Sequence, residues 1–152
     1  VLLNYPGMSY ASPAAALAAL MGDLVFVCPA RRTARALAAA GVKTYLYTFT
    51  VQPSYSAKAP FLGSYHTAEV PFVFATPPPS LTFNAKEAAL ATGMLGYWTR
   101  FARLGDPNLA GQVVWPTFAE ATDRHMAFGL SDVKTGVGLK KKQCDFWDTL
   151  MN

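Results

Sequence analysis

A short run of β-branched and aromatic residues constrains the fold of this chain more than any other feature. The segment KTYLYTFTV, residues 43–51, has the composition of a β-strand. Alternation places its aromatic side chains on one face, whereas Leu46 falls on the other. Because the second face also carries an apolar residue, we expect this strand to be covered on both sides, as strands of parallel sheets are. A helical pattern precedes it closely, so the chain is predicted to be an α/β protein.

Two helices are predicted before this strand. Ser12 is a good N-cap and Pro13 a good first helical residue, and Gly22 is expected to lie just past the end of the first helix. The second helix begins at either Asp23 or Pro29, and its small apolar residues share one face while three arginines lie on the other. Residues 1–22 carry no charge, but the Pro, Gly, Asn and Ser residues that interrupt them argue against a transmembrane segment or a signal peptide.

The clearest helix is predicted over residues 85–104. Asn84 is placed to cap it, Glu87 stands at capping-box spacing, and Gly105 is expected to end it. An apolar stripe along this helix indicates a core face. The remaining predictions, listed in chain order, are a long loop at 52–69, an apolar strand-like segment at 70–74, a stiff connector at 76–80, a short strand at 126–130 and a short helix at 144–150.

Composition points to one domain that buries much of its surface. The 152 residues suffice for a single domain, 1–152, with its own core. However, 52% of residues are hydrophobic and only 14% are charged, whereas roughly a quarter is usual. Either much of the surface is covered by something else, or the chain is part of a larger body.

The net charge of +4 comes from 13 basic and 9 acidic residues, and it does not indicate a nucleic-acid partner. Basic residues cluster at two places, Arg31, Arg32 and Arg35, and then Lys140, Lys141 and Lys142. Neither cluster has interleaved aromatic residues that could stack on bases. Both clusters are therefore interpreted as the solvated faces of a helix and a loop.

Spacing alone identifies no complete catalytic or metal site. No pair of Cys or His residues has a zinc-ligand spacing, and no Gly-rich phosphate loop or G-x-S-x-G elbow is present, so no cofactor or metal is predicted. His66 lies in the long loop, where most histidines are ordinary polar groups. Cys28 and Cys144 could be two free thiols; if they are bridged, they close a long loop that stabilises the fold by roughly 4–5 kcal/mol on the chain-entropy model.

Three stretches together resemble the C-terminal part of the type-B carboxylesterase and cholinesterase family. They are DLVFVCPARRTARALAAAGVKTYLYTF, GSYHTAEVPFVF, and the series YWTRFARLGDPN, WPTF and CDFWD. The similarity covers nearly the whole chain and keeps the family's order. The most specific parts are the H-x-x-E-x-x-F-V-F block, the Y-W-x-x-F-A-x-x-G-D-P-N block and the terminal C-x-F-W.

This resemblance implies the C-terminal portion of an α/β-hydrolase fold and the activity of a serine esterase or lipase. His66 matches the catalytic histidine, which takes the proton of the nucleophile and returns it to the leaving alcohol. Glu69 matches an acidic residue that supports the loop rather than the triad acid. Cys28 and Cys144 match a disulfide pair, which implies a secreted or lumenal protein.

The sequence departs from the family at a few positions and lacks the family's N-terminal part. Thr67 and Ala75 occupy positions where Gly is common, and the prolines at 77–79 are unusual. The Ser elbow and the triad acid lie upstream in the family, so the sheet is expected to be incomplete without a companion N-terminal portion. The predicted substrate is a small ester or a lipid. An alternative is a cholinesterase-like domain without catalysis that serves in adhesion or as a scaffold.

Overall fold

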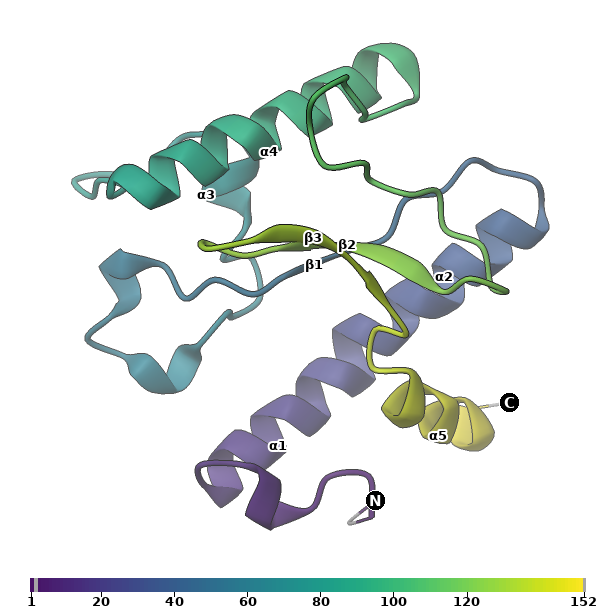
Figure 1. The fold of residues 1–152 in the computed structure, drawn as a ribbon. Coiled ribbons are helices and arrows are strands. Elements are labelled where there is room, and N and C mark those ends of the chain that lie inside the picture. The colour runs from purple at the N-terminus through teal and green to yellow at the C-terminus, as the bar shows by residue number, and fades with distance from the viewer. Residues whose placement is uncertain (2, 152) are drawn as a thin grey trace.

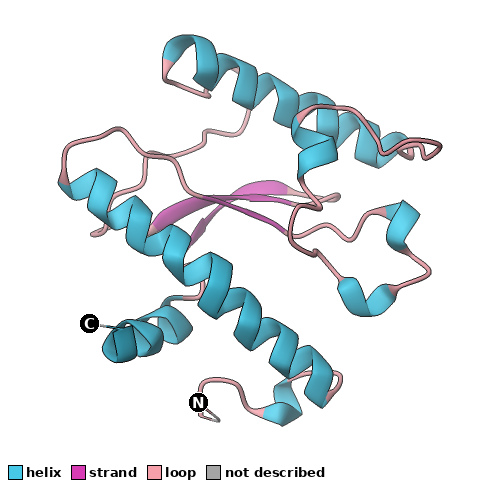
Figure 2. Ribbon diagram, turned by 180° about the vertical axis from the view of Figure 1, so that it is seen from behind, coloured by secondary structure: helices cyan, strands magenta, loops and turns pink. Residues whose placement is uncertain are grey.

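A small sheet lies between two helical layers in the computed structural model, which describes residues 1 and 3–151. One long helix crosses one face of the sheet and a second long helix covers the opposite face (Figures 1 and 2). The helical elements are η1 (Gly7–Ser9), α1 (Pro13–Gly22), the π-helical turn η2 (Asp23–Val27), α2 (Cys28–Ala39), η3 (Ser54–Ser56), η4 (Pro60–Leu62), α3 (Val70–Val73), α4 (Ala85–Leu104) and α5 (Lys141–Met151). The strands are β1 (Tyr47–Phe49), β2 (Arg124–Phe128) and β3 (Val133–Val137).

The sheet is mixed and has the order β1-β2-β3. Strand β1 runs parallel to β2, with Tyr47 opposite Met126, and β2 runs antiparallel to β3. The predicted strands at 43–51 and 126–130 are therefore present, although β1 is only three residues long. Strand β3 has no counterpart in the sequence predictions, because its exposed residues and Gly136 give it no apolar alternation.

Both faces of β1 and of the two residues that lead into it are covered, as the sequence predicts. On one face Tyr45, Tyr47 and Phe49 pack against the main core, which α4 shares. On the other face Leu46 is buried with Ala34 of α2. The main core consists of Val51, Phe72, Leu90, Ala91, Met94, Tyr97, Trp115, Met126 and Phe128. This layering is that of a partial α/β fold.

Helix α4 follows its sequence signals closely. The Asn84 side chain accepts from the amide of Glu87, and the Glu87 carboxylate accepts from the amide of Asn84, so the capping box is complete. Gly105 ends the helix with a left-handed φ of 67°. The predicted helix at 144–150 is also present, as part of α5.

The first two predicted helices form one continuous helix, so the expected break at Gly22 is wrong. Gly22 is helical, and the chain continues without a break into the π-helical turn that begins at Asp23 and then into α2, which has Pro29 in its first turn. The π-helical turn between α1 and α2 absorbs the irregularity, because the amide of Cys28 donates to the carbonyl of Asp23 five residues earlier. Pro29 has no amide hydrogen, and it follows directly after this wider turn, where the regular ladder is already interrupted.

The continuous helix Pro13–Ala39 is long and apolar enough to cross a membrane by length and composition. A signal sequence or a core helix of a soluble protein meets the same criteria, so one such helix is weak evidence. Its second half is joined to other elements through Cys28 and Arg31. That residues 1–22 form no membrane segment stays a prediction.

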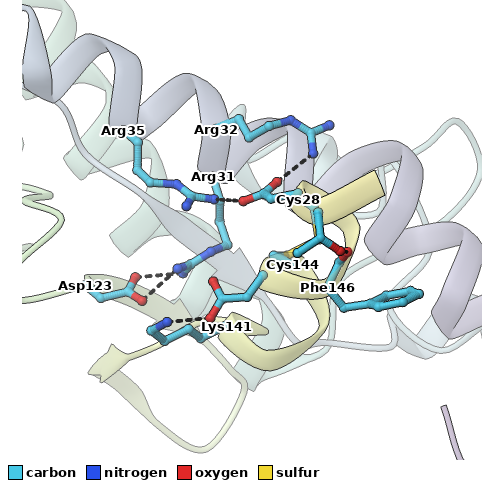
Figure 3. Close-up of polar contacts among 11 residues, drawn as sticks. Cys28, Arg31, Arg32, Arg35, Asp123, Lys141, Cys144 and Phe146 are labelled. Atoms are coloured by element: carbon cyan, nitrogen blue, oxygen red, sulfur yellow. Dashed lines mark hydrogen bonds and ion pairs between the residues drawn. A yellow bond between two sulfur atoms is a disulfide. The ribbon is translucent and has the colours of Figure 1, made fainter. Parts of the chain in front are cut away.

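The solvated-face interpretation of the three arginines is also wrong. Arg31 is buried and binds both carboxylate oxygens of Asp123 at 2.7 Å. Arg32 and Arg35 share the carboxylate of Asp148, at 2.9 and 2.6 Å. Figure 3 shows these arginines reaching from the long helix toward β2 and α5. Carboxylates that are distant in sequence pair with them, and helical periodicity cannot reveal such partners.

The second basic cluster is paired in part. Lys140 lies 3.4 Å from the carboxylate of the buried Asp23, and Lys141 pairs with Asp145 one turn further along α5.

The prediction of a strand-like segment at 70–74 is wrong, because Val70–Val73 forms the short helix α3. Pro71 lies in its first turn, where a missing amide hydrogen costs nothing.

Candidate active site

His66 lies on an exposed turn in the long loop that follows the carboxyl end of β1. Its imidazole stacks on the ring of Phe26 from the π-helical turn, with centroids 4.0 Å apart and planes 16° apart. Among the residues that the structure describes, no side chain forms a hydrogen bond or an ion pair with this imidazole. The aromatic contact is therefore the interaction that defines its surroundings within this chain.

The loop that carries His66 is fastened on both sides of the histidine. Before it, the Ser64 hydroxyl donates to the carbonyl of Phe49 at the end of β1, at 2.8 Å. After it, Ala68 is fully buried, and its amide donates to the carbonyl of Tyr65 at 3.0 Å. These contacts hold the histidine turn at the end of the strand while the side chain itself stays exposed.

Glu87 of α4 fastens the beginning of the same loop. Its carboxylate is fully buried and accepts from the Ser54 amide at 2.5 Å and from the Ser54 hydroxyl at 2.6 Å. It also accepts from the Asn84 amide at 2.9 Å as part of the capping box. One carboxylate therefore joins the start of α4 to the first turn of the histidine loop. The sequence predicts the cap, but the contact with Ser54 has no local signal.

Thr67, directly after the histidine, has a left-handed φ of 72°, and Ala75 at the end of α3 has a φ of 50°. These are the two positions at which the resembling family commonly carries Gly. Left-handed backbone is unfavourable for residues with a Cβ, by roughly 1–2 kcal/mol, and more so for a β-branched residue such as threonine. The structure thus gives the physical reason for a glycine preference that this sequence does not follow.

Glu69 is partly buried and lies beside the phenol of Tyr47 on β1. Burial, and then the nearby negative charge of Glu69, raises the pKa of Tyr47 to about 12. No hydrogen bond between Glu69 and His66 occurs among the described residues. The structure thus places Glu69 at the N-cap of α3, near Tyr47 of the sheet.

Cys28 and Cys144 form the disulfide that the resemblance implies. Their Cα atoms are 5.1 Å apart, 116 residues separate them in sequence, and both are fully buried. The bond links the start of α2 to α5 and lies within a small cluster formed with Tyr5 and Trp147. Cys28 follows Phe26 by two residues, so one end of the disulfide lies close in sequence to the residue that stacks on His66.

The described residues contain no group of three His, Cys, Asp or Glu side chains that could hold a metal ion. Two hollows on the surface are lined by other parts of the chain, one around Tyr45 and Trp115 and the other around Lys86 and Leu130. His66 lines neither of them. These hollows are open, and no catalytic side chain predicted from the sequence lies in them, so the histidine turn is the better candidate site.

His66 and Glu69 stay predictions as site residues, and no sequence signal indicated the residues that hold the histidine turn. Phe26 lies forty residues earlier, in a helical segment without a catalytic pattern, and only the tertiary structure brings it to the imidazole. Ser64 and Ser54 are ordinary loop residues by sequence. Their partners become apparent only when β1, the loop and α4 lie together.

The layered architecture, with helices on both faces of a small mixed sheet, is that of a partial α/β protein. The profile of the "Carboxylesterase family" matches residues 3–147. This chain belongs to the carboxylesterase family.

Similar proteins include acetylcholinesterase from Leptinotarsa decemlineata, which is 32% identical over 133 residues, and carboxylesterase 5A from Felis catus, which is 33% identical over 136 residues. The acylcarnitine hydrolase of Mus musculus is 34% identical over 134 residues. The matches cover 87%, 84% and 84% of this chain, but only 21%, 25% and 23% of the respective relatives. The chain thus spans about a quarter or less of the length of these relatives.

Proposed function

We propose that this chain is part of a serine hydrolase of carboxylic esters, in which His66 is the general base and acid. The observation that carries the proposal is the position of His66 within the matched family block, exposed on the loop after the carboxyl end of β1. Ligands of α/β sheets bind outside the carboxyl ends of the strands. An ester bound there would reach the imidazole.

In the proposed reaction, a serine hydroxyl gives its proton to an imidazole nitrogen of His66 while its oxygen bonds to the ester carbonyl carbon. His66 then gives this proton to the alcohol oxygen as the carbon–oxygen bond breaks, which leaves an acyl-enzyme and a free alcohol. Water attacks the acyl-enzyme with the same help from His66 and releases the carboxylic acid. Protons and electrons balance without a cofactor.

The serine nucleophile and the triad acid would come from a companion N-terminal portion, as a separate chain or as another segment of the same polypeptide. The 152 residues contain no G-x-S-x-G elbow. Helix α1 and the π-helical turn expose Leu17, Met21 and Val25, which recur every four residues and so share one face. A larger body covering this apolar stripe would remove it from water, which supports the proposal.

The proposed substrate is a small carboxylic ester or a lipid. The names of the relatives support ester hydrolysis in general and do not favour the alternative of a non-catalytic adhesion or scaffold domain. We propose that Glu69 supports the histidine loop and does not complete the triad. The disulfide between Cys28 and Cys144 supports folding in an oxidising compartment, secreted or lumenal.

Labelling with a fluorophosphonate tests this function, because the probe forms a covalent adduct only with an activated serine. The full protein that contains this chain should be labelled at a serine outside the 152 residues, and His66→Ala should abolish labelling. Lys58→Ala, at an exposed position in the same loop, should leave labelling unchanged. Undiminished labelling of His66→Ala would show that His66 is not the base.

A further inference from the structure

We infer that helix α5 is a remote positioning element for His66. It holds the π-helical turn Asp23–Val27, and this turn holds the ring of Phe26 against the imidazole. The inference rests on the proposed role of His66 as the general base. It assigns a function to a turn, a tyrosine and a tryptophan that the reaction itself does not require.

The direction of the Phe26 ring must be set by its backbone, because its side chain is not locked in a core. Phe26 is 45% exposed, yet its ring lies nearly parallel to the imidazole of His66 at 4.0 Å. A parallel stack at this distance fixes the plane of the histidine ring and leaves its edge, which carries the nitrogens, uncovered. A base that must reach both a serine and a leaving group needs this kind of orientation.

The π-helical turn decides which way Phe26 points. It contains one residue more than a regular turn, and the amide of Cys28 donates to the carbonyl of Asp23 to close it. Each residue of an α-helix advances the side-chain direction by about 100°. If the turn relaxed to a regular helix, the residues before and after it would rotate relative to each other by about that angle. Phe26 would then leave the imidazole.

The first residue of the turn is connected to α5 through a buried chain of hydrogen bonds. The Tyr5 hydroxyl donates to a carboxylate oxygen of Asp23 at 3.1 Å, and the Trp147 indole nitrogen donates to the same hydroxyl at 2.8 Å. All three side chains are buried. Burial raises the pKa of Tyr5 to about 12, so the hydroxyl keeps the proton that it donates. Lys140, just before α5, lies 3.4 Å from the same carboxylate and balances its charge.

The end of the turn is connected to the same helix by a covalent bond. Cys28 follows the turn directly and forms its disulfide with Cys144 of α5. The two connections therefore bracket Phe26, with Asp23 three residues before it and Cys28 two residues after it. Helix α5 is in turn held to α2 by the ion pairs of Asp148 with two arginines. Because both ends of the turn are held by one rigid element, α5 prevents the turn from relaxing.

The test uses the full protein with ¹³C-labelled histidine and follows the His66 ring signals by NMR, identified from their absence in His66→Ala. A stacked phenyl ring shifts these signals upfield. Phe26→Leu should remove this shift, and Phe26→Tyr, which keeps the ring, should restore it. Tyr5→Phe removes the hydroxyl that joins Trp147 to Asp23, and it should move the signals part of the way toward those of Phe26→Leu.

Tyr10→Phe is the matched control, because Tyr10 packs against the same buried cluster but has no hydroxyl partner among the described residues. It should leave the His66 signals in place. Reduction of the disulfide should act like Tyr5→Phe. Unchanged His66 signals in Tyr5→Phe would overturn the inference, as would an equal change in Tyr10→Phe, which would indicate general loosening.

A second readout separates this inference from the proposed function. Phe26→Leu should slow fluorophosphonate labelling about tenfold, because a misplaced base is a poorer one, and Phe26→Tyr should recover the rate. If His66→Ala keeps full labelling, the proposed function fails, whereas the NMR signals still report whether α5 positions the ring. If the signals respond as expected but labelling of Phe26→Leu is unchanged, the ring contact exists without a positioning role, and the inference fails alone.

Discussion

At the residue scale, the turn at Thr67 is the least favourable piece of backbone near the candidate base. Its φ of 72° is a conformation that glycine adopts freely and that a β-branched residue rarely does. The turn persists because its neighbours are fixed, with Ala68 buried on one side and Ser64 bound to Phe49 on the other. Strain of this kind is held in place by the surrounding structure.

Thr67→Gly should therefore stabilise the protein by about 0.5–1 kcal/mol. The relief of left-handed strain, roughly 1–2 kcal/mol, outweighs the greater entropy that glycine adds to the unfolded chain. Urea denaturation followed by circular dichroism measures the change. Thr67→Ala is the control, because alanine keeps the Cβ and should change the stability much less. A loss of stability in Thr67→Gly would show that the threonine side chain makes a stabilising contact that outweighs the strain.

At the element scale, Glu87 shows how one side chain can join two elements. It completes the cap of α4 and also binds the amide and hydroxyl of Ser54 in the histidine loop. Its complete burial means that its loss would leave three donors without their charged partner. Charge-assisted hydrogen bonds of this kind are among the stronger ones in proteins.

Glu87→Ala should destabilise the protein by roughly 3 kcal/mol, because a cap and two loop contacts are lost together. The loop at 52–69 should also become more accessible, so limited proteolysis should cleave it faster. Lys86→Ala removes an exposed side chain next to it and should change neither quantity. Equal cleavage rates in the two variants would show that Glu87 does not restrain the loop.

At the scale of the whole molecule, His125 lies where three elements meet. This buried histidine of β2 lies beside Gly136 of β3, where an added Cβ would come within 2.5 Å of its ring. The ion pair between Arg31 of α2 and Asp123 is close by. Burial lowers the pKa of His125, and the positive charge of Arg31 lowers it further, while Asp123 opposes this shift.

Stability should consequently fall on acidification, beginning near pH 6.5. The unfolded chain, in which histidine has a pKa of about 6.5, binds a proton more readily than the folded protein does, so stability decreases as the pH falls below that value. His125→Phe keeps a flat ring in the slot beside Gly136 and should remove the part of the pH dependence of stability that comes from His125. Urea midpoints measured from pH 8 to pH 5 check it. The same slope in both proteins would show that another group is responsible.

A second decrease in the stability of the folded protein is expected below about pH 4. Although burial opposes it, the hydrogen bonds from Arg32 and Arg35 lower the pKa of Asp148, so this carboxylate stabilises the fold above its unfolded pKa and loses that effect as it is protonated. His125→Phe should leave this lower transition unchanged, which distinguishes the two groups in one titration.

The sequence by itself determined the features whose signals are local. The capping box at Asn84 and Glu87 and the stop at Gly105 placed α4, and apolar residues on both sides of residues 43–51 indicated a strand between two layers. Sequence motifs similarly pointed to the family and to the cysteine pair. These predictions succeed because helix caps and alternation act over a few residues.

Only the tertiary structure decided the features that depend on distant partners. Gly22 does not end its helix, because the Asp23 carboxylate accepts a hydrogen bond from the Tyr5 hydroxyl, which in turn accepts one from Trp147, and the π-helical turn is retained. The three arginines are drawn to Asp123 and Asp148, about a hundred residues away, instead of facing solvent. The stack of Phe26 on His66 has the same origin. A buried charge, a strained turn or an oriented imidazole is stable only when its partners are in place, and only folding brings those partners together.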